Sequence, residues 1–227
     1  MPSGRALIIE ERVTVPDAAF DLAGYRAWVT SDAYPQGVRT TYVRGAVLVE
    51  MSPESLESHN QVKLAMTLGV GSCVRAHDLG VVYPDGALVT HEAAGLSCEP
   101  DLTFVSWAAF DDTRVVLRPR AHDQADAIDI VGSPDLVVEI VSDASVKKDT
   151  RLLREAYCRA AVREYWLADA RGSEILFEIL SNAGSSFTSS AHPAPPQKSQ
   201  VLGGNWRLTR ARNRAGRFDY TLDRVTG

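Results

Sequence analysis

The stretch Pro134-Asp135-Leu136-Val137-Val138-Glu139-Ile140-Val141-Ser142 decides the predicted fold. Its nearly continuous run of Val, Leu and Ile, with polar residues at both ends, predicts a β-strand that is buried on both faces. Glu139 lies in the middle of this strand, where a carboxylate loses its hydration unless a cation or hydrogen bonds replace the water. Two interpretations are open: Glu139 reaches solvent or an internal arginine, or it binds a metal ion.

A second acid stands within another apolar segment. Asp101 follows Pro100 in a strand predicted from Cys98 to Val105. A Pro-Asp pair alone is ordinary turn chemistry. If the two strands are neighbours, however, Asp101 and Glu139 repel each other, and a divalent cation between them is the usual resolution. The pair therefore predicts a metal site.

Length and composition favour one large domain, or a core with an appendage, in a chain of 227 residues that are 45% hydrophobic. No apolar run approaches the ~20 residues of a membrane span, and the first residues lack the layout of a secretory signal. We therefore expect a cytoplasmic protein with no membrane partner. Because the net charge is −5, binding to nucleic acid requires a local basic surface.

The other patterns predict hairpins in the first half of the chain and a strand–helix–strand crossover in the second. The fold class is therefore α/β, bordering on α+β: a mixed central β-sheet flanked by helices, with an N-terminal hairpin. The expected elements are a helix after Pro16, a hairpin of 39–43 with 46–51 around Gly45, a helix from 52 to 77, a second hairpin of 81–83 with 87–90, a polar loop over 108–132 with a short strand at 115–117, a helix over 151–161 and strands over 162–169 and 173–180.

The C-terminal part carries the most basic segment. Residues 191–196 form a Pro-rich connector, and short strand-like runs over 199–222 alternate with arginines. This segment either contacts phosphates or is a solvated extension, and charged surface segments are usually solvated. We expect residues 1–190 to form the main domain and residues 191–227 to form a connector and a basic β extension packed on it.

With these pieces in order, the chain resembles the Uma-type restriction endonucleases of the PD-(D/E)XK nuclease superfamily. The resemblance is carried by Pro100-Asp101, by the strand with Glu139, and by the run from Lys148-Asp149-Thr150 through Tyr157 to Asp169. It covers residues 16–182. It implies a restriction-endonuclease-like fold in which Asp101 and Glu139 bind Mg²⁺, with Mn²⁺ as the alternative.

The resemblance also implies that a helix-borne acid or His59 lies near the metal, and we expect His59 with Glu50 or Glu57 to complete the site or to lie just outside it. Without the resemblance, a single His on the apolar face of the predicted helix is more often a hydrogen-bonded core residue. The chain departs from the superfamily at the lysine that orients the attacking water, because Val141 stands two residues after Glu139. Lys147 and Lys148 are the nearby candidates for that role, and the alternative is that both are surface lysines.

These features predict a metal-dependent DNA endonuclease that hydrolyses phosphodiester bonds with metal-activated water. A homodimer is implied by the resemblance alone, because superfamily nucleases that cut both strands often dimerise. The alternative is a weakly active or inactive nuclease-fold protein that binds nucleic acid or protein. A third interpretation, a zinc hydrolase that uses His59, His91 and a carboxylate, is weaker because these histidines lack ligand spacing.

Overall fold

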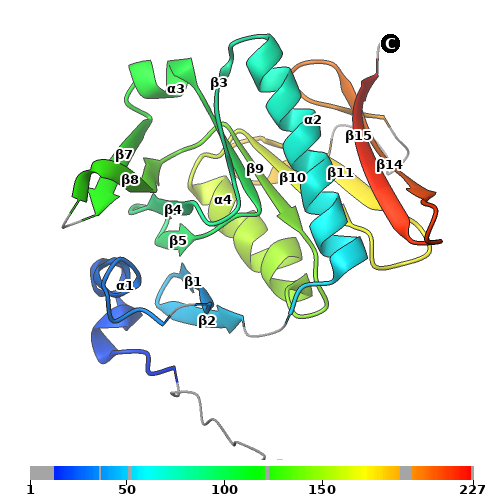
Figure 1. Ribbon diagram of the computed structural model, residues 1–227. Helices are drawn as coiled ribbons and strands as arrows, with labels where there is room; N and C mark the ends of the chain where they lie inside the picture. The colour runs from blue at the N-terminus through cyan, green and yellow to red at the C-terminus, as the bar shows by residue number, and fades with distance from the viewer. Residues whose placement is uncertain (1–12, 36, 51–52, 121–122, 190–195, 226–227) are drawn as a thin grey trace, which may run out of the picture.

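The computed structural model describes residues 13–35, 37–50, 53–120, 123–189 and 196–225. Within these ranges the chain forms two six-stranded sheets and one three-stranded sheet. Figure 1 shows the sheet that contains β9 and β10 between the helices α2 and α4, with the N-terminal elements on one side and β14 and β15 on the other. No helix in these ranges is long and apolar enough to span a membrane.

The central sheet is mixed, as predicted, because β9 and β10 pair in parallel while its other neighbours pair antiparallel. All five residues of β9 are buried, which confirms the strand predicted around Glu139. The strand order is β12-β11-β10-β9-β6-β3, and the strands are β3 (Gly80–Pro84), β6 (Leu102–Ser106), β9 (Leu136–Ile140), β10 (Glu164–Asp169), β11 (Leu176–Asn182) and β12 (Phe187–Ser189).

Two helices cover the faces of this sheet, and each begins with a π-helical turn. The turn η2 (Leu56–Gln61) leads into α2 (Val62–Ala76), and η3 (Lys148–Leu153) leads into α4 (Arg154–Arg159). The hydrophobic cluster between the sheet and α2 includes Leu136, Val138 and Ile140 of β9. The cluster between the sheet and α4 includes the alternate residue Val137. Glu139 shares the period of Val137 and therefore lies on the α4 side of the sheet.

The second sheet holds the N-terminal hairpin. The predicted turn is confirmed, with φ of 85° at Gly45 and also 48° at Arg44. The sheet has the order β2-β1-β5-β4-β8-β7, and its strands and the nearby helices are η1 (Asp17–Phe20), α1 (Leu22–Val29), β1 (Arg39–Val43), β2 (Ala46–Glu50), β4 (Leu88–His91), β5 (Leu96–Cys98), α3 (Trp107–Asp111), β7 (Val115–Arg120) and β8 (Asp123–Gly132).

Two predictions about strands are wrong, and a third is right only in part. Residues 81–83 and 87–90 form no hairpin, because β3 pairs with β6 while β4 pairs with β5 and β8 of the other sheet. The strand predicted from Cys98 to Val105 is divided between the two sheets and interrupted at Pro100. The short strand predicted over 115–117 in the polar connection is confirmed as part of β7, but the rest of residues 108–132 is not a loop and contains α3 and β8, which pairs antiparallel with β7. An antiparallel edge can face water and needs no continuous apolar run.

The long helix begins later than predicted. Ser55 caps it with a side chain that accepts a hydrogen bond from the backbone nitrogen of Ser58 at 3.2 Å, while Ser52 lies outside the described residues. A serine oxygen at this position satisfies one of the free backbone N–H groups of the first turn. The cap therefore sets the start of the helical segment at Leu56.

The C-terminal strands are β13 (Gln197–Lys198), β14 (Asn205–Arg212) and β15 (Phe218–Val225). They pack on α2 through four side chains that belong to its core, namely Trp206, Leu208, Tyr220 and Leu222. Gly69 of α2 permits this contact, because a Cβ there would lie 2.8 Å from Leu222 Cδ2. The predicted Pro-rich connector, except Pro196, lies outside the described residues.

Candidate metal centre

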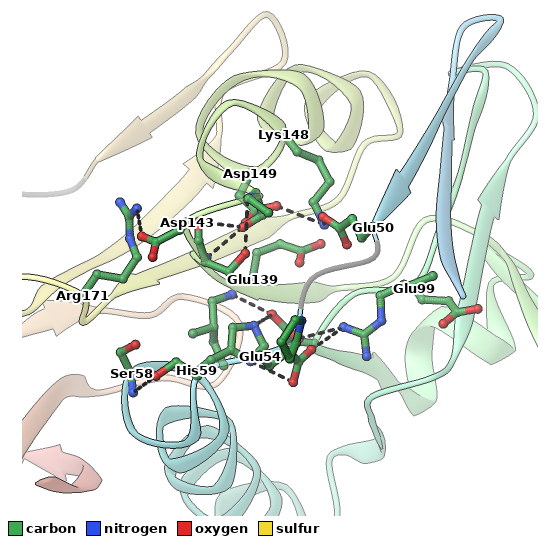
Figure 2. Close-up of a pocket in the computed structure, with 18 of the residues that line it drawn as sticks. Glu50, Glu54, Ser58, His59, Glu99, Glu139, Asp143, Lys148, Asp149 and Arg171 are labelled. Atoms are coloured by element: carbon green, nitrogen blue, oxygen red, sulfur yellow. Dashed lines mark hydrogen bonds and ion pairs between the residues drawn. The ribbon is translucent and has the colours of Figure 1, made fainter. Parts of the chain in front are cut away.

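A cavity of about 720 Å³ opens where β6 and β9 of the central sheet meet the turns η2 and η3 and the end of β2. Acidic side chains dominate its wall, and Figure 2 shows several of them pointing into the same space. The charged and titratable residues that line the cavity are Arg39, Glu50, Glu54, His59, Glu99, Asp101, Glu139, Asp143, Lys148, Asp149 and Arg171.

Asp101 and Glu139 reach this cavity from neighbouring strands. β6 and β9 are antiparallel, with Leu102 opposite Val138, so the residues next to this pair, Asp101 and Glu139, lie at the same level. Both acids are buried, and Asp101 Oδ2 accepts a hydrogen bond of 2.8 Å from the backbone nitrogen of Ile140. The pairing thus brings together the two acids that the sequence singled out.

Basic side chains surround the carboxylate of Asp101. Lys63 Nζ lies 3.0 Å from Asp101 Oδ1, His59 Nε2 lies 3.5 Å from Oδ2, and Arg39 Nη1 lies 3.7 Å from Oδ1. Burial raises the pKa of Asp101, but the contact with His59, the charge of Lys63 and the hydrogen bond from Ile140 outweigh it and hold this pKa below its usual value. Asp101 is therefore ionised at neutral pH.

Three ligand atoms converge on this side of the cavity. Glu54, His59 and Asp101 each offer one, and all lie within 4.8 Å of one another. His59 Nδ1 lies 3.2 Å from Glu54 Oε2. Among the described residues, neither His59 Nδ1 nor Asp101 Oδ1 has a hydrogen-bond partner of good geometry. Buried nitrogen and oxygen atoms that lack such partners are available to bind a cation.

Glu139 has a different environment. Tyr157 Oη donates a hydrogen bond of 2.5 Å to Glu139 Oε1. Burial raises the pKa of Glu139 well above its usual value, and the charges of Asp149 and Asp101 raise it further, while Lys148 acts in the opposite direction. In the absence of a bound cation, Glu139 therefore retains its proton at a pH where Asp101 is ionised.

Lys148 is the ammonium group on the Glu139 side. Its Nζ lies 2.8 Å from Glu50 Oε1 and 3.4 Å from Asp149 Oδ1. Burial alone would lower the pKa of Lys148, but the charges of Glu139, Asp149 and Glu50 raise it above the usual value. Burial also raises the pKa of Asp149 to about 6, although Lys148 and a hydrogen bond from Ser145 oppose this shift.

The π-helical turns place the helix-borne residues of the site. His59 lies on η2, and Lys148 and Asp149 lie on η3. Wide helical turns of this kind occur frequently at functional sites. Both turns also end in the helices that cover the sheet, so the packing of α2 and α4 holds the side chains over the ends of β6 and β9.

The other predicted site residues lie elsewhere. Lys147 is exposed and does not line the cavity. Glu57 accepts hydrogen bonds from Arg217 Nη1 at 3.1 Å and from the backbone nitrogen of Phe218 at 3.0 Å, so its carboxylate is engaged by the C-terminal strands. His91 lies on β4 and accepts a hydrogen bond from the backbone nitrogen of Ala94, and it does not line the cavity either.

Sequence reasoning missed Glu54, Lys63, Arg39 and Tyr157 as parts of the site. One signal was available: Lys63 follows His59 by four residues, a spacing that places two side chains on one helical face. Glu54 resembles an ordinary acid before a helix, and Arg39 and Tyr157 are far from Asp101 and Glu139 in the sequence. Only strand pairing and helix packing bring them next to these two acids.

Comparison with known proteins adds two findings. Residues 25–210 match the model of the Uma2 family, described as "Putative restriction endonuclease". Among solved structures, the chain is similar to the crystal structure of a putative nuclease belonging to DUF820 from Anabaena variabilis ATCC 29413, with 15% sequence identity and a TM-score of 0.54 over 72% of this chain and 83% of that chain. At this identity the similarity shows the fold. No curated protein matches the chain.

Proposed function

The chain belongs to the Uma2 family, and on this premise we propose that it is a metal-dependent endonuclease that hydrolyses phosphodiester bonds in DNA. The observation that carries the proposal is the meeting of Asp101 and Glu139, from neighbouring strands, in one cavity that His59 and Lys148 also line. A cluster of buried acids is costly unless cations neutralise it, and a nuclease site uses such a cluster to hold a divalent ion.

The donor atoms fit Mg²⁺ or Mn²⁺. Asp101, Glu139 and Glu54 offer carboxylate oxygens, which Mg²⁺ prefers, and His59 adds a nitrogen, which Mn²⁺ accepts more readily. When bound, the ion supplies a water of lowered pKa and neutralises charge on the phosphoryl oxygens. We assign Asp101 and Glu139 as the central ligands and His59 with Glu54 as the residues that complete the set, in place of Glu57, which the C-terminal strands engage.

Lys148 takes the role of the superfamily lysine in this proposal. Its ammonium group lies inside the cavity, 2.8 Å from Glu50 Oε1, and it remains protonated because acids surround it. A fixed ammonium in this place can donate hydrogen bonds to the attacking water or to a phosphate oxygen. Lys147, which is exposed, has no such access and serves as the matched control.

The second candidate is a nuclease-fold protein that binds nucleic acid or protein without cutting it. Two observations favour it: Val141 occupies the position of the superfamily lysine, and Lys63 and Arg39 already lie within 3.0 and 3.7 Å of Asp101 Oδ1. Protein cations so close to a proposed ligand compete with a metal ion for the same charge.

Cleavage assays separate the two candidates. We expect nicking of supercoiled plasmid in Mg²⁺ or Mn²⁺ and none in EDTA, with parallel assays on single-stranded DNA and RNA. Glu139→Ala and Lys148→Met should each reduce the rate at least about 100-fold, whereas Lys147→Met should cut like the wild type. Cleavage that persists in Glu139→Ala would refute the assignment of this ligand. Calorimetric metal binding without any cleavage by the wild type would favour the binding protein.

We further propose that the active form is a cytoplasmic homodimer, because two copies of a single site are needed to cut both strands of a duplex at one place. Light scattering of the purified protein, alone and with a duplex, measures the mass directly. A monomeric mass under conditions in which the enzyme makes double-strand breaks would contradict the dimer.

A further inference from the structure

The hairpin of β14 and β15 carries a concentration of positive charge in an otherwise acidic chain. Residues 205–225 contain six arginines and two aspartates, although the whole chain has a net charge of −5. The hairpin is therefore a local basic surface of the kind that binding to nucleic acid requires. Figure 1 shows the hairpin beside α2, with its turn near the helix end that is preceded by η2.

One face of this hairpin changes from apolar to basic along its length. On β14 the inward positions Trp206 and Leu208 are buried in the core with α2, and the same alternation continues through Arg210 and Arg212. On β15, Phe218 is the cross-strand partner of Arg212. Because side chains two residues apart share a face, these two arginines extend the core-facing side beyond the point where the core ends.

Phe218 holds the two guanidinium groups together. Arg210 Cζ lies 4.4 Å and Arg212 Cζ lies 4.6 Å from the centre of its ring. Guanidinium groups stack favourably on an aromatic face without losing their charge. We refer to Arg210, Arg212 and Phe218 as the arginine stack.

The arginine stack forms no ion pair with a carboxylate among the described residues, although Glu57 lies close enough for the charge of Arg212 to contribute to lowering the pKa of Glu57. Arg210 donates hydrogen bonds to the backbone carbonyls of Gly172 and Ser173, and Arg212 donates to that of Gly216. Neutral acceptors and a neutral ring fix these side chains and leave two positive charges for an external anion.

Contacts on two sides attach the arginine stack to the rim of the proposed active site. The carbonyls that bind Arg210 directly follow Arg171, which lines the cavity. Glu57, which accepts the backbone N–H of Phe218, directly precedes Ser58, which also lines it. Figure 2 shows Arg171 and Ser58 on the same side of the cavity.

From these observations we propose that the arginine stack binds the phosphate backbone of a nucleic acid beside the cavity and so positions the strand for cleavage. The inference rests on the proposed function for the identity of the partner. Arginine is suited to this task because its planar guanidinium donates two parallel hydrogen bonds to phosphate oxygens. The proposal also gives Glu57 a role: its carboxylate holds Phe218 of the arginine stack in place and does not bind the metal ion.

Binding of a short labelled duplex, measured by fluorescence anisotropy in EDTA, tests the inference without cleavage. The double variant Arg210→Gln/Arg212→Gln should weaken binding at least about tenfold and reduce the slope of log affinity against log salt by roughly two. The control is Arg207→Gln, which removes one charge from the opposite, exposed face of the same strand and should change affinity less than about twofold.

Two further variants keep the test sound if the double variant folds poorly. Arg210→Lys/Arg212→Lys keeps both charges and should retain the salt slope, whereas Phe218→Leu should weaken binding a few-fold at an unchanged slope, because it removes the stacking and leaves the charges. Wild-type affinity in the double variant, or an equal loss in Arg207→Gln, would overturn the inference.

Metal-site variants make the two proposals separable. Asp101→Asn should lose cleavage and keep duplex binding. Duplex binding that depends on Arg210 and Arg212 in a protein that never cuts would sustain this inference and refute the nuclease. Cleavage and binding that are both insensitive to loss of these arginines would sustain the nuclease and refute this inference.

Discussion

The two acids at the centre of the cavity are equally buried and lie on neighbouring strands, yet their pKa values move in opposite directions. The pKa of Asp101 is lowered, and the pKa of Glu139 is raised. Burial raises both, so the surroundings decide the difference. We call the first group the Asp101 side, which has Asp101, Glu54, His59, Lys63 and Arg39. The second is the Glu139 side, which has Glu139, Asp149, Glu50, Lys148 and Tyr157.

The comparison indicates where the proposed metal ion would neutralise the most charge. On the Asp101 side two permanent cations and a histidine accompany three acids, because Asp85 also pairs with Arg39 and Lys63. On the Glu139 side Lys148 faces three carboxyl groups, and no arginine contacts Glu139 among the described residues. Once ionised, Glu139 therefore depends on a bound divalent ion more than Asp101 does, because the cation whose charge stabilises it, Lys148, is shared among three carboxyl groups.

The largest expected effect is on stability without metal. Asp101→Asn should lower the free energy of unfolding by about 3 kcal/mol, because it removes the acid closest to the buried cation of Lys63 and leaves only Glu54 and Asp85, at 3.3 and 3.2 Å, beside it. Glu139→Gln should cost less than about 1 kcal/mol, since a protonated carboxyl and an amide have nearly the same shape and neither is charged. Urea unfolding in EDTA measures both, and equal losses would break the comparison.

The second effect is on the pH dependence of stability without metal. The folded pKa of Asp149 is about 6, against an ordinary value of 3.8, so its contribution is fully present below pH 3.8 and is lost as the pH rises through 6. We expect the free energy of unfolding to fall by about 2 to 3 kcal/mol across this range from Asp149 alone. Asp149→Asn should remove this slope, whereas Asp143→Asn, which alters an exposed acid nearby, should retain it.

Metal binding should itself depend on pH. Because a bound cation must displace the proton of Glu139, we expect the affinity for Mg²⁺ to rise about tenfold per pH unit below the raised pKa of this group. Calorimetry in buffers of different ionisation enthalpy counts the protons released. Glu139→Gln should release none through this group, and an unchanged proton count in that variant would place the titrating group elsewhere.

A smaller effect is expected from the tyrosine that contacts Glu139. Tyr157→Phe removes the hydrogen bond to Glu139 Oε1, which should cost about 1 kcal/mol of stability. Because this hydrogen bond lowers the pKa of Glu139, its loss should shift the pH profile of metal binding to higher pH. The control is Tyr165→Phe, which removes a hydrogen bond to the backbone carbonyl of Asp149. It should cost similar stability without shifting the profile, and an equal shift in both would show that the effect is not specific to Glu139.

The smallest effect tests the two acids near His59. Glu57→Gln should change metal affinity less than about twofold, because its partners are Arg217 and Phe218. Glu54→Gln should reduce the affinity for the metal ion about tenfold, since Glu54 contributes one ligand atom to a cluster with His59 and Asp101. Titration with Mn²⁺ by calorimetry measures both, and the reverse order of the two variants would restore Glu57 as the ligand.

The sequence by itself determined the features that depend on nearby residues. The apolar run around Glu139 identified a doubly buried strand, the Arg44-Gly45 turn identified the first hairpin, and the spacing of residues 56–76 identified the long helix. These signals are local, because backbone conformation and side-chain period are set within a few residues. The unexpected acid within each apolar segment also marked Asp101 and Glu139 without any structure.

Only the tertiary structure decided what those acids meet. Whether β3 and β4 join one sheet or two, whether Glu54 or Glu57 faces His59, and which of the two central acids keeps its proton all depend on residues that the chain brings together from distant positions. A pKa reports the sum of burial and neighbouring charges, and those neighbours follow from strand pairing and helix packing. Sequence patterns identify the acids, and the packed fold sets their charge.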